Sequence, residues 1–452
     1  MKNSTGLTKL LTKAAVIAFW IGLWAIIAAL INKEILIASP LQTVERLFEL
    51  SRTSRFWVAA LSSLARIFIG FAIGTVLGAV FGALSAAIPF LKELVSPVIS
   101  VMRATPVASF ILLALVWIKA VNVPTFIVVL IVFPIIFADV FTGIKAAPGE
   151  LLEMANSFKV PKIRKIRYIY LQSVLPFFTS GCAAALGLAW KSGIAAEVLS
   201  TPKNSVGTML NEAKIYIETP DLFALTAVVI MLSMLLEFVI MKAVKKGENI
   251  VITGRKNTEI RQIPHNSTNS SITSRKLSKS YNGKEVLKDF DITLKPGVTA
   301  LMGESGSGKT TLLRVLAGLE EDDSGTKKAV CERPAVMFQE DRLLPNVSVA
   351  QNILFVNKYA DVKKLLTALE LEENENDLPS ELSGGMCRRV ALARTLAYGG
   401  DALFLDEPFK GLDAAMRERV STNVMKIIGN TPTLLITHDE VNFARETIVL
   451  SF

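Results

Sequence analysis

The chain has 452 residues, of which 51% are hydrophobic, and its mean hydropathy of +0.45 is high for a soluble protein. Its net charge of +9 does not indicate nucleic-acid binding, because no nucleic-acid-reading motif accompanies it and many basic residues stand at the ends of apolar stretches. Three widely spaced cysteines form no disulfide or metal-binding pattern, and two histidines are too few for a histidine-based metal centre.

The first half of the chain contains six apolar stretches, each long enough to cross roughly 30 Å of hydrocarbon. They lie at about residues 14–32, 57–87, 93–118, 123–144, 172–199 and 220–243. The third contains Arg103 and Pro106, so it is either one kinked span or two shorter pieces. The second has a glycine at every fourth position, which predicts close packing of a neighbouring helix on that face. These glycines are Gly70, Gly74, Gly78 and Gly82.

The loops between the stretches predict their orientation. The segment 145–171 carries six lysines and arginines, whereas the segment 200–219 carries two. Basic loops stay in the cytoplasm, so the first of these loops is predicted to be cytoplasmic. With six spans, both ends of the chain and its entire second half then lie in the cytoplasm. The predicted location is the cytoplasmic membrane, crossed several times.

Ionisable residues inside apolar stretches are costly in a lipid membrane, so each is a candidate for function. Lys191 and Glu197 share the fifth stretch and are the better candidates for lining a path across the membrane. Asp139 and Glu237 are explained equally well by pairing or by lying near the end of a span.

The composition changes after the sixth stretch. Residues 247–271 are polar and predict a flexible tether, with a segment ordered on the following domain as the alternative. In residues 272–452, short β-rich runs alternate with helical patterns, which is typical of an α/β sheet with crossover helices. The sequence therefore predicts an all-α membrane domain of about six transmembrane helices at residues 1–246, followed by an α/β domain.

The α/β domain contains a predicted phosphate-binding loop. Residues 303–310 match the pattern G-x-x-x-x-G-K-[ST], between a predicted strand at 298–302 and a predicted helix from 311. Backbone N–H groups and the helix N-terminus would surround the phosphates of a nucleotide. Lys309 would reach the β- and γ-phosphates, and Thr310 would hold Mg²⁺. The predicted ATP-binding residues here are Gly303, Glu304, Ser305, Gly306, Ser307, Gly308, Lys309, Thr310 and Thr311.

Two adjacent carboxylates follow a second predicted buried strand, residues 402–405. Asp406 is placed to hold Mg²⁺, and Glu407 is placed to polarise the attacking water as a general base. Together with the phosphate loop, this pair predicts an enzyme that hydrolyses ATP.

Further motifs make residues 272–452 resemble the nucleotide-binding subunit of an ABC transporter. Residues 382–386 resemble the family signature LSGGQ, with Met386 in place of glutamine. The resemblance implies that Ser383, Gly384 and Gly385 complete the ATP pocket of the opposite subunit, so that the protein is a homodimer. It also implies roles at four single positions. These are Tyr281 stacking on adenine, Gln339 sensing Mg²⁺, Asp413 at the dimer interface, and His438 contacting the γ-phosphate as a catalytic residue.

The membrane half resembles the permeases of binding-protein-dependent importers. Residues 153–159 and 169–176 are similar to the family's cytoplasmic EAA loop, which docks on the ATPase, although Lys159 replaces a glycine and Gln172 a proline. Short segments at 38–40, 103–108 and 195–197 resemble nitrate, sulfonate and taurine permeases in particular. An amphipathic loop lying on the membrane surface is the alternative for the basic segment.

These resemblances imply an ATP-driven importer of a small solute, working as a homodimeric half-transporter with an external solute-binding protein. A small anion such as nitrate, a sulfonate or taurine is the implied substrate, with a thiamine-precursor pyrimidine as the alternative, and no nucleic acid is expected to bind. Two alternatives remain at this point. The first is an exporter, since fused half-transporters are often exporters. The second is a membrane ATPase that signals without transporting anything.

Overall fold

The computed structural model describes residues 4–252, 271–304, 306–323, 331–438 and 444–450. The chain forms two compact units, and the loop between two apolar helices belongs to the second of them. The first unit consists of Met1–Ala146 and Val174–Gly247, and the second of Ala147–Ser173 and Glu248–Phe452. Most of the predicted linker, residues 253–270, lies outside the described residues.

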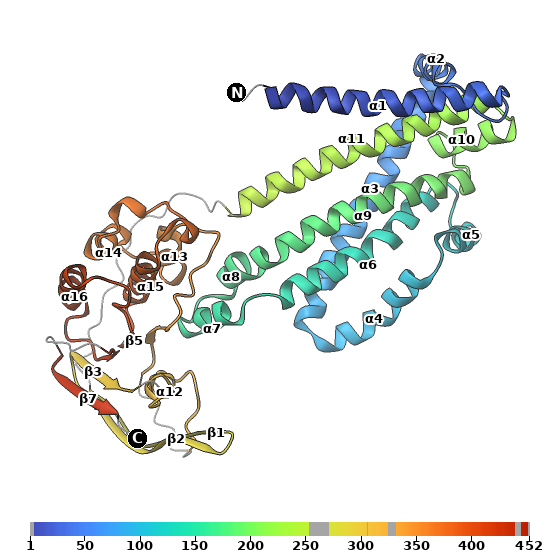
Figure 1. Ribbon diagram of the computed structural model, residues 1–452. Helices are drawn as coiled ribbons and strands as arrows, with labels where there is room; N and C mark the ends of the chain where they lie inside the picture. The colour runs from blue at the N-terminus through green and yellow to red at the C-terminus, as the bar shows by residue number, and fades with distance from the viewer. Residues whose placement is uncertain (1–3, 253–270, 305, 324–330, 439–443, 451–452) are drawn as a thin grey trace. The chain divides into compact units, whose positions relative to one another are not determined.

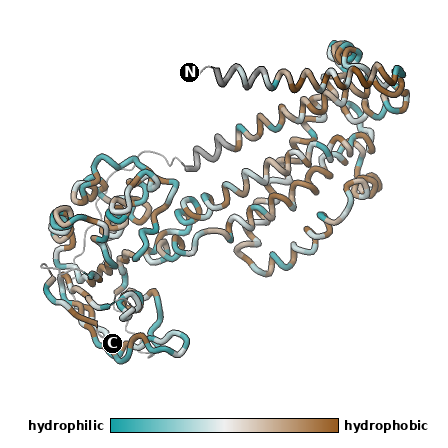
Figure 2. Tube along the Cα trace, in the orientation of Figure 1, coloured by the Kyte–Doolittle hydropathy of each residue, from teal (hydrophilic) through white to brown (hydrophobic). Residues whose placement is uncertain are grey.

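The first unit is built from helices alone in its described part (Figure 1). They are α1 (Ser4–Ile31), α2 (Pro40–Ser51), α3 (Ser54–Ala87), α4 (Pro89–Ala104), α5 (Val107–Trp117), α6 (Val123–Lys145), α9 (Leu171–Ser200), α10 (Val206–Ile215) and α11 (Thr219–Ile252). Apolar residues run along most of their length (Figure 2). Five of these helices are long and apolar enough to span a membrane.

The third predicted stretch is broken into two helices. α4 ends at Ala104, α5 begins at Val107, and the pair is bent by 108°. The cause is Pro106, which cannot donate a backbone hydrogen bond and keeps Thr105 in an extended conformation with φ −83° and ψ 129°. Counting this bent pair as one span gives six spans, the predicted number.

The glycine repeat of α3 packs against α6, as predicted. All four glycines are buried, and a Cβ atom added at any of them would lie 2.7–2.8 Å from the nearest atom of α6. At Gly78, for example, the nearest atoms would be the Phe133 carbonyl oxygen at 2.8 Å and Ile136 Cβ at 2.9 Å. The glycines therefore set the distance between the two helix backbones.

Glu197 is the centre of a buried polar cluster in the first unit. Its carboxylate is fully buried and accepts hydrogen bonds from Ser63 Oγ at 2.7 Å and Arg66 Nε at 3.0 Å. The backbone N–H of Gly207, at the start of α10, donates to the same carboxylate at 3.2 Å. Glu197 thus ties α9 to α3 and α10. The expectation that it lines an open path is wrong for this unit, because paired partners enclose the side chain. Lys191, in contrast, is exposed on α9.

The second unit contains a parallel sheet of five strands in the order β4-β5-β6-β3-β7. The strands are β3 (Val298–Gly303), β4 (Pro334–Met337), β5 (Ala402–Asp406), β6 (Thr433–Ile436) and β7 (Glu446–Leu450). A separate antiparallel pair consists of β1 (Ile272–Tyr281) and β2 (Lys284–Leu294). β3 and β5 flank β6, so the phosphate loop after β3 and the carboxylates after β5 emerge at the same edge.

Helices surround this sheet. Further helices come from residues Ala147–Ser173, the loop between α6 and α9, which is called the membrane-derived loop below. The helices after β3 are α12 (Lys309–Leu316), α13 (Val349–Val356), α14 (Val362–Ala368), α15 (Gly384–Tyr398) and α16 (Ala414–Ile428), with short 3-10 turns at Glu372–Asn374 and Pro379–Glu381. The loop contributes α7 (Gly149–Ser157), α8 (Lys162–Lys165) and a π-helical turn (Ile166–Tyr170) that runs into α9.

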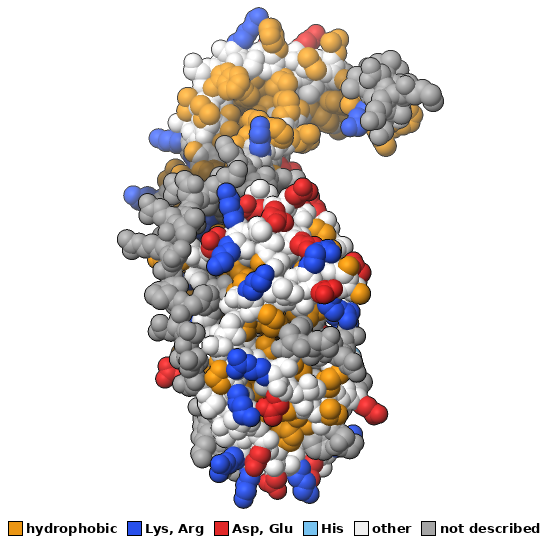
Figure 3. Space-filling model, turned by 90° about the vertical axis from the view of Figure 1, so that its left-hand side faces the viewer, with side chains coloured by type: hydrophobic (Ala, Val, Ile, Leu, Met, Phe, Trp, Pro, Cys, Tyr) orange, Lys and Arg blue, Asp and Glu red, His pale blue; other side chains and the backbone are white. Residues whose placement is uncertain are grey.

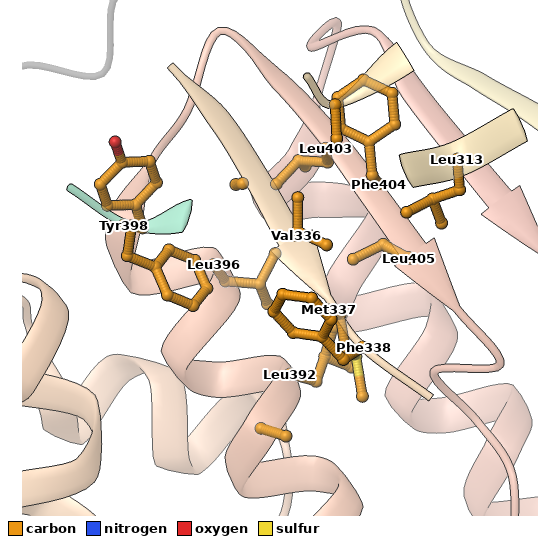
Figure 4. Close-up of a cluster of buried hydrophobic side chains, with 14 of the residues drawn as sticks. Leu313, Val336, Met337, Phe338, Leu392, Leu396, Tyr398, Leu403, Phe404 and Leu405 are labelled. Atoms are coloured by element: carbon orange, nitrogen blue, oxygen red, sulfur yellow. The ribbon is translucent and has the colours of Figure 1, made fainter. Parts of the chain in front are cut away.

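The core of the second unit lies between the sheet and α15. Phe404 of β5 and Val336 of β4 are fully buried, and Leu392 and Leu396 of α15 pack against the same side (Figure 4). The outer surface differs between the units. Figure 3 shows charged side chains of both signs spread over the second unit and apolar side chains gathered on the membrane-type helices.

Candidate active site

The phosphate loop leaves β3 at Gly303 and enters α12 at Lys309. Gly306 and Gly308 have φ values of 86° and 82°, in the left-handed region where glycine is strongly favoured. Gly303 also approaches a neighbouring strand closely, since an added Cβ would lie 2.5 Å from the Leu450 carbonyl oxygen. Ser305 lies outside the described residues.

Two buried side chains of this loop are suited to receive an anion. Lys309 is 7% exposed, and its Nζ donates to the carbonyl oxygens of Gly303 at 2.8 Å and Glu304 at 2.6 Å. The Ser307 hydroxyl is buried and has no hydrogen-bond partner among the described residues. A buried hydroxyl without a partner carries a free-energy cost that a bound phosphate would relieve.

Asp406 ends β5 and faces the phosphate-loop helix. The Thr310 hydroxyl donates to Asp406 Oδ2 at 3.1 Å, which joins the two predicted Mg²⁺ ligands. Asp406 is 3% exposed. Burial is the largest influence and raises the pKa of this carboxyl. The hydrogen bond from Thr310 lowers the pKa, whereas the neighbouring charge of Glu407 raises it, and the pKa lies above its usual range.

Glu407 has both carboxylate oxygens in contact with other side chains. Lys410 Nζ lies 2.8 Å from Oε2, and His438 Nε2 lies 3.2 Å from Oε1. Burial acts to raise the pKa of Glu407, but the Lys410 hydrogen bond and the charges of Lys410, His438 and Arg388 outweigh it, so the pKa lies below the usual range. The backbone of Glu407 has a φ of 49°, an uncommon left-handed conformation for this residue type.

A cleft of ≈ 270 Å³ brings half of the predicted residues together. Its lining includes nine of them: Gly306, Gly308, Lys309, Thr310, Thr311, Gln339, Asp406, Glu407 and His438. Val286 of β2 and Ile436 of β6 also line it, and neither has a sequence signal of its own. A second cleft of ≈ 410 Å³ shares Gln339, Glu407 and His438 with the first and adds Lys410.

Four predicted residues lie away from this cleft and cap or adjoin helices. The Ser383 hydroxyl accepts from Met386 N at 3.4 Å at the start of α15, and Asp413 Oδ1 accepts from Met416 N at 2.9 Å at the start of α16. Gly384 lies in the first turn of α15, and Gly385 is close enough to Gly411 that an added Cβ would lie 3.0 Å from its carbonyl oxygen. The signature segment and the Asp413 loop are thus neighbours.

Tyr281 ends β1 and does not line the described cleft. Its ring is 41% exposed, and its hydroxyl donates to Glu320. Lys279 Nζ lies 5.7 Å from the centre of this ring, and the stacking of Tyr281 on adenine stays a prediction.

Arg388 is a site residue that the sequence analysis missed. It is 4% exposed, and its guanidinium contacts the carbonyl oxygens of both Asp406 and Glu407 from α15. The sequence offered one signal, a basic residue two positions after the signature, but it did not reveal which groups the side chain reaches.

The membrane-derived loop packs against the rest of the second unit mainly through Glu153 and Phe158. Glu153 accepts from Arg342 Nη1 at 2.8 Å and also from Arg314 of α12. Phe158 is 1% exposed, with its ring edge-on to Tyr398 at 5.1 Å and the Arg394 guanidinium 5.9 Å from the ring centre.

The polar residues of the same loop bond to backbone carbonyls. Arg164 Nη1 donates to the Phe355 carbonyl oxygen at 2.6 Å, and Lys159 Nζ donates to that of Glu332 at 2.5 Å. Lys159, which replaces a glycine of the resembling family, keeps a glycine-like φ of 47°. These contacts favour the docking loop predicted from residues 153–176 over a loop lying on the membrane.

Comparison with known proteins agrees with this geometry. A family model described as ABC transporter matches residues 287–410, and one described as binding-protein-dependent transport system inner membrane component matches residues 74–246. The aliphatic sulfonates import ATP-binding protein SsuB of Corynebacterium glutamicum is 44% identical over 179 residues, which cover 37% of this chain and 73% of that protein. The chain belongs to the ABC transporter family. It joins a permease domain and an ATP-binding domain in one polypeptide.

Other relatives of this ABC transporter are also import ATPases. SsuB 1 of Rhodococcus jostii is 42% identical over 39% of this chain and 74% of its own length. The Fe(3+) ions import ATP-binding protein FbpC 2 of Pectobacterium atrosepticum is 36% identical over 39% of this chain and 58% of its own length. A solved structure, a putative ABC transporter ATP-binding protein from Pyrococcus furiosus, aligns at 24% identity and a TM-score of 0.36 over 40% of this chain and 98% of that one.

These matches establish the class of activity. The ABC transporter couples ATP hydrolysis to transport, and its permease match and import relatives support an ABC importer embedded in a membrane. Asp413 and His438 lie beyond residue 410, where the family match ends, and their roles stay predictions.

Proposed function

We propose that two copies of this chain import a small solute across the cytoplasmic membrane, driven by ATP and supplied by an external solute-binding protein. The docked loop carries this proposal. Residues 147–173 are continuous with the apolar helices α6 and α9, yet they pack within the ATPase unit through Glu153, Arg164 and Phe158. A rearrangement of the ATPase therefore has a covalent route to the membrane helices.

The proposed hydrolysis uses the residues that line the cleft. Backbone N–H groups of the loop and Lys309 hold the phosphates, and Glu407 accepts a proton from the attacking water. The water oxygen bonds to the γ-phosphorus as the bond to the bridging oxygen breaks, which releases ADP and phosphate. His438 contacts Glu407 and lines the same cleft, which supports its proposed role at the γ-phosphate.

The chain's oxygen donors suit Mg²⁺. This ion binds through one or two carboxylates, retained waters and substrate phosphates rather than through a cage of protein ligands. Thr310 and Asp406 provide such a hydroxyl and carboxylate in contact, with Gln339 in the same cleft. Bound there, Mg²⁺ would neutralise charge developing on the phosphates.

A homodimer is proposed because part of the predicted ATP site lies outside the cleft. Ser383, Gly384 and Gly385 do not line it in their own chain, although they form the N-terminus of α15. A helix N-terminus is a favourable anion site, so a second copy could supply it to the nucleotide. Each of the two ATP sites would then take its phosphate loop from one copy and its signature from the other.

The proposed solute is a small anion such as a sulfonate, taurine or nitrate. Several import relatives are named for aliphatic sulfonates, although the Fe(3+) relative indicates that likeness in the ATPase alone does not set the substrate. Lys191 also supports an anion. It is exposed on α9 nine residues before the helix end, about 13 Å at the α-helical rise. A lysine at that depth is expected to face water or a ligand rather than lipid.

ATP hydrolysis in lipid nanodiscs tests the proposal. The purified protein is assayed with candidate solute-binding proteins and a panel of sulfonates, taurine and nitrate, with Glu407→Gln as the inactive control. Stimulation by one ligand-loaded binding protein is expected. A high basal rate that ignores binding protein and ligand would instead favour the exporter or the signalling ATPase, which solute accumulation in sealed vesicles separates.

A further inference from the structure

Arg388 uses every side of its guanidinium. Nε donates to the Glu407 carbonyl oxygen at 3.0 Å, and Nη2 donates to that of Asp406. Nη1 lies 2.9 Å from each of three acceptors, which are the carbonyl oxygens of Phe338 and Gln339 and the carboxylate of Asp341. A planar, permanently charged fork is the side chain best suited to bridge several fixed oxygens in this way.

These acceptors belong to two functional segments. Asp406 and Glu407 end β5 and carry the proposed Mg²⁺ ligand and general base. Phe338, Gln339 and Asp341 follow β4, and Gln339 lines the nucleotide cleft. β4 and β5 are hydrogen-bonded neighbours in the sheet, but their registered pairs stop at Met337 and Leu405. Beyond that point, hydrogen bonds from the Arg388 side chain connect the two chain segments.

The segment after β4 also meets the membrane-derived loop. Arg342 Nη1 donates to Glu153 at 2.8 Å, and its guanidinium lies 3.9 Å from the centre of the Phe338 ring. Arg394 fixes the backbone here, donating to the carbonyl oxygens of Asp341 and Arg342 at 2.8 Å and 2.7 Å. A continuous path thus runs from Glu153 by a hydrogen bond to Arg342, along the backbone to Asp341, and by a second hydrogen bond to Arg388.

We propose that Arg388 is a positioning residue that couples the membrane-derived loop to catalysis. It holds the backbone of Asp406 and Glu407 to the segment after β4, which Glu153 contacts through Arg342. When the loop moves, Arg342 and Asp341 move with it, and Arg388 transfers that displacement to the two carboxylates. Small displacements matter, because misplacing a reacting group by about 1 Å costs on the order of 100-fold in rate. The inference rests on ATP hydrolysis and is independent of the transported solute.

Arg389 provides a matched comparison. It is the next residue on α15, is 6% exposed, and donates through Nη1 to the carbonyl oxygens of Leu369 and Glu370 at 2.6 Å and 2.8 Å. Its acceptors follow α14 and lie outside both functional segments. Replacing either arginine removes a buried charge and its hydrogen bonds, but only Arg388 contacts the backbone of the catalytic strand.

A double-mutant cycle in the full-length protein tests the proposal. Glu153→Gln is introduced into the wild type, into Arg388→Gln and into Arg389→Gln, and kcat and KM for ATP are measured in nanodiscs. Glu153→Gln is expected to lower kcat on the order of fivefold in the wild type and in the Arg389→Gln background. Arg388→Gln alone is expected to lower kcat on the order of 10-fold or more with a near-normal KM. In that background, Glu153→Gln should have no further effect on kcat.

Two outcomes would overturn the proposal. One is a full Glu153→Gln effect in the Arg388→Gln background, which would mean that the signal bypasses Arg388. The other is loss of the effect in the Arg389→Gln background too, which would mean that any damage to α15 suffices. If Arg388→Gln does not fold, Arg388→Lys replaces it. A point charge with three donors cannot bridge five acceptors, so the cycle should again show a reduced Glu153 effect.

Discussion

Glu153 of the membrane-derived loop lies between Arg342 and Arg314, and it accepts hydrogen bonds from both. Arg314 belongs to the helix that follows the phosphate loop, and Arg342 stands three residues after Gln339. One carboxylate of the permease loop therefore contacts both segments that flank the nucleotide cleft. Burial acts to raise the pKa of Glu153, but the two arginine hydrogen bonds and charges outweigh it, and the pKa lies below its usual range.

The lowered pKa of Glu153 predicts a particular pH dependence of stability. A carboxyl whose pKa is lower in the folded state stabilises the fold above its unfolded pKa of about 4.3, and this contribution disappears as pH falls through the folded value. Wild type should therefore unfold at a higher temperature than Glu153→Gln by a constant margin between about pH 6 and 8. The margin should shrink below about pH 4. Thermal unfolding across this range measures it, and a margin that grows with acidity would contradict the assignment.

Lys410 is predicted to restrain the general base. With Lys410 at 2.8 Å and His438 at 3.2 Å, each oxygen of Glu407 has a partner, and the ammonium lowers its proton affinity. Lys410→Ala should free one oxygen and raise basal kcat severalfold with little change in KM for ATP. Lys410→Arg keeps the charge and is the control. A fall in kcat for Lys410→Ala would show instead that the ion pair orients Glu407 for attack.

The parts of the site that the sequence predicted are those encoded by contiguous motifs. Asp406 ends β5 and Glu407 follows it, while Lys309 and Thr310 begin the helix after the loop that leaves β3. Parallel strands place such ends at one edge of the sheet. The glycine repeat of α3 was predictable for a similar reason, since its four-residue period is a local property of the helix.

The parts that the sequence did not predict depend on distant partners. Nothing near Arg388 in the chain indicates that it reaches the ends of β4 and β5. Glu197 was expected to line a path, but Ser63 and Arg66, more than 130 residues away, enclose it. The partner of Lys159, the Glu332 carbonyl oxygen, also comes from the other half of the chain. Such contacts follow from the packing of whole elements, which no short motif encodes.

The Glu197 cluster predicts a strong effect on stability. Removing the carboxylate leaves Arg66, whose side chain is 13% exposed, without its ion-pair partner. Glu197→Ala should therefore cost about 3–5 kcal/mol, as for other broken buried pairs. Lys191→Ala on the exposed face of α9 is the control and should change stability by less than about 0.5 kcal/mol. Unfolding in detergent compares the variants, and equal losses would argue against a structural role for Glu197.

Gly78 offers a test of how the membrane helices pack. A methyl group there would lie 2.8 Å from the Phe133 carbonyl oxygen and 2.9 Å from Ile136 Cβ, so α3 and α6 must separate to admit it. Gly78→Ala should destabilise the protein by about 1–3 kcal/mol, the usual cost of overpacking. Gly187→Ala on α9, where an added Cβ meets nothing within 4 Å, should be neutral or slightly stabilising because alanine favours the helix. Both variants are compared by thermal unfolding and by yield in detergent. Equal behaviour would mean that α3 and α6 tolerate a wider separation than the glycine face indicates.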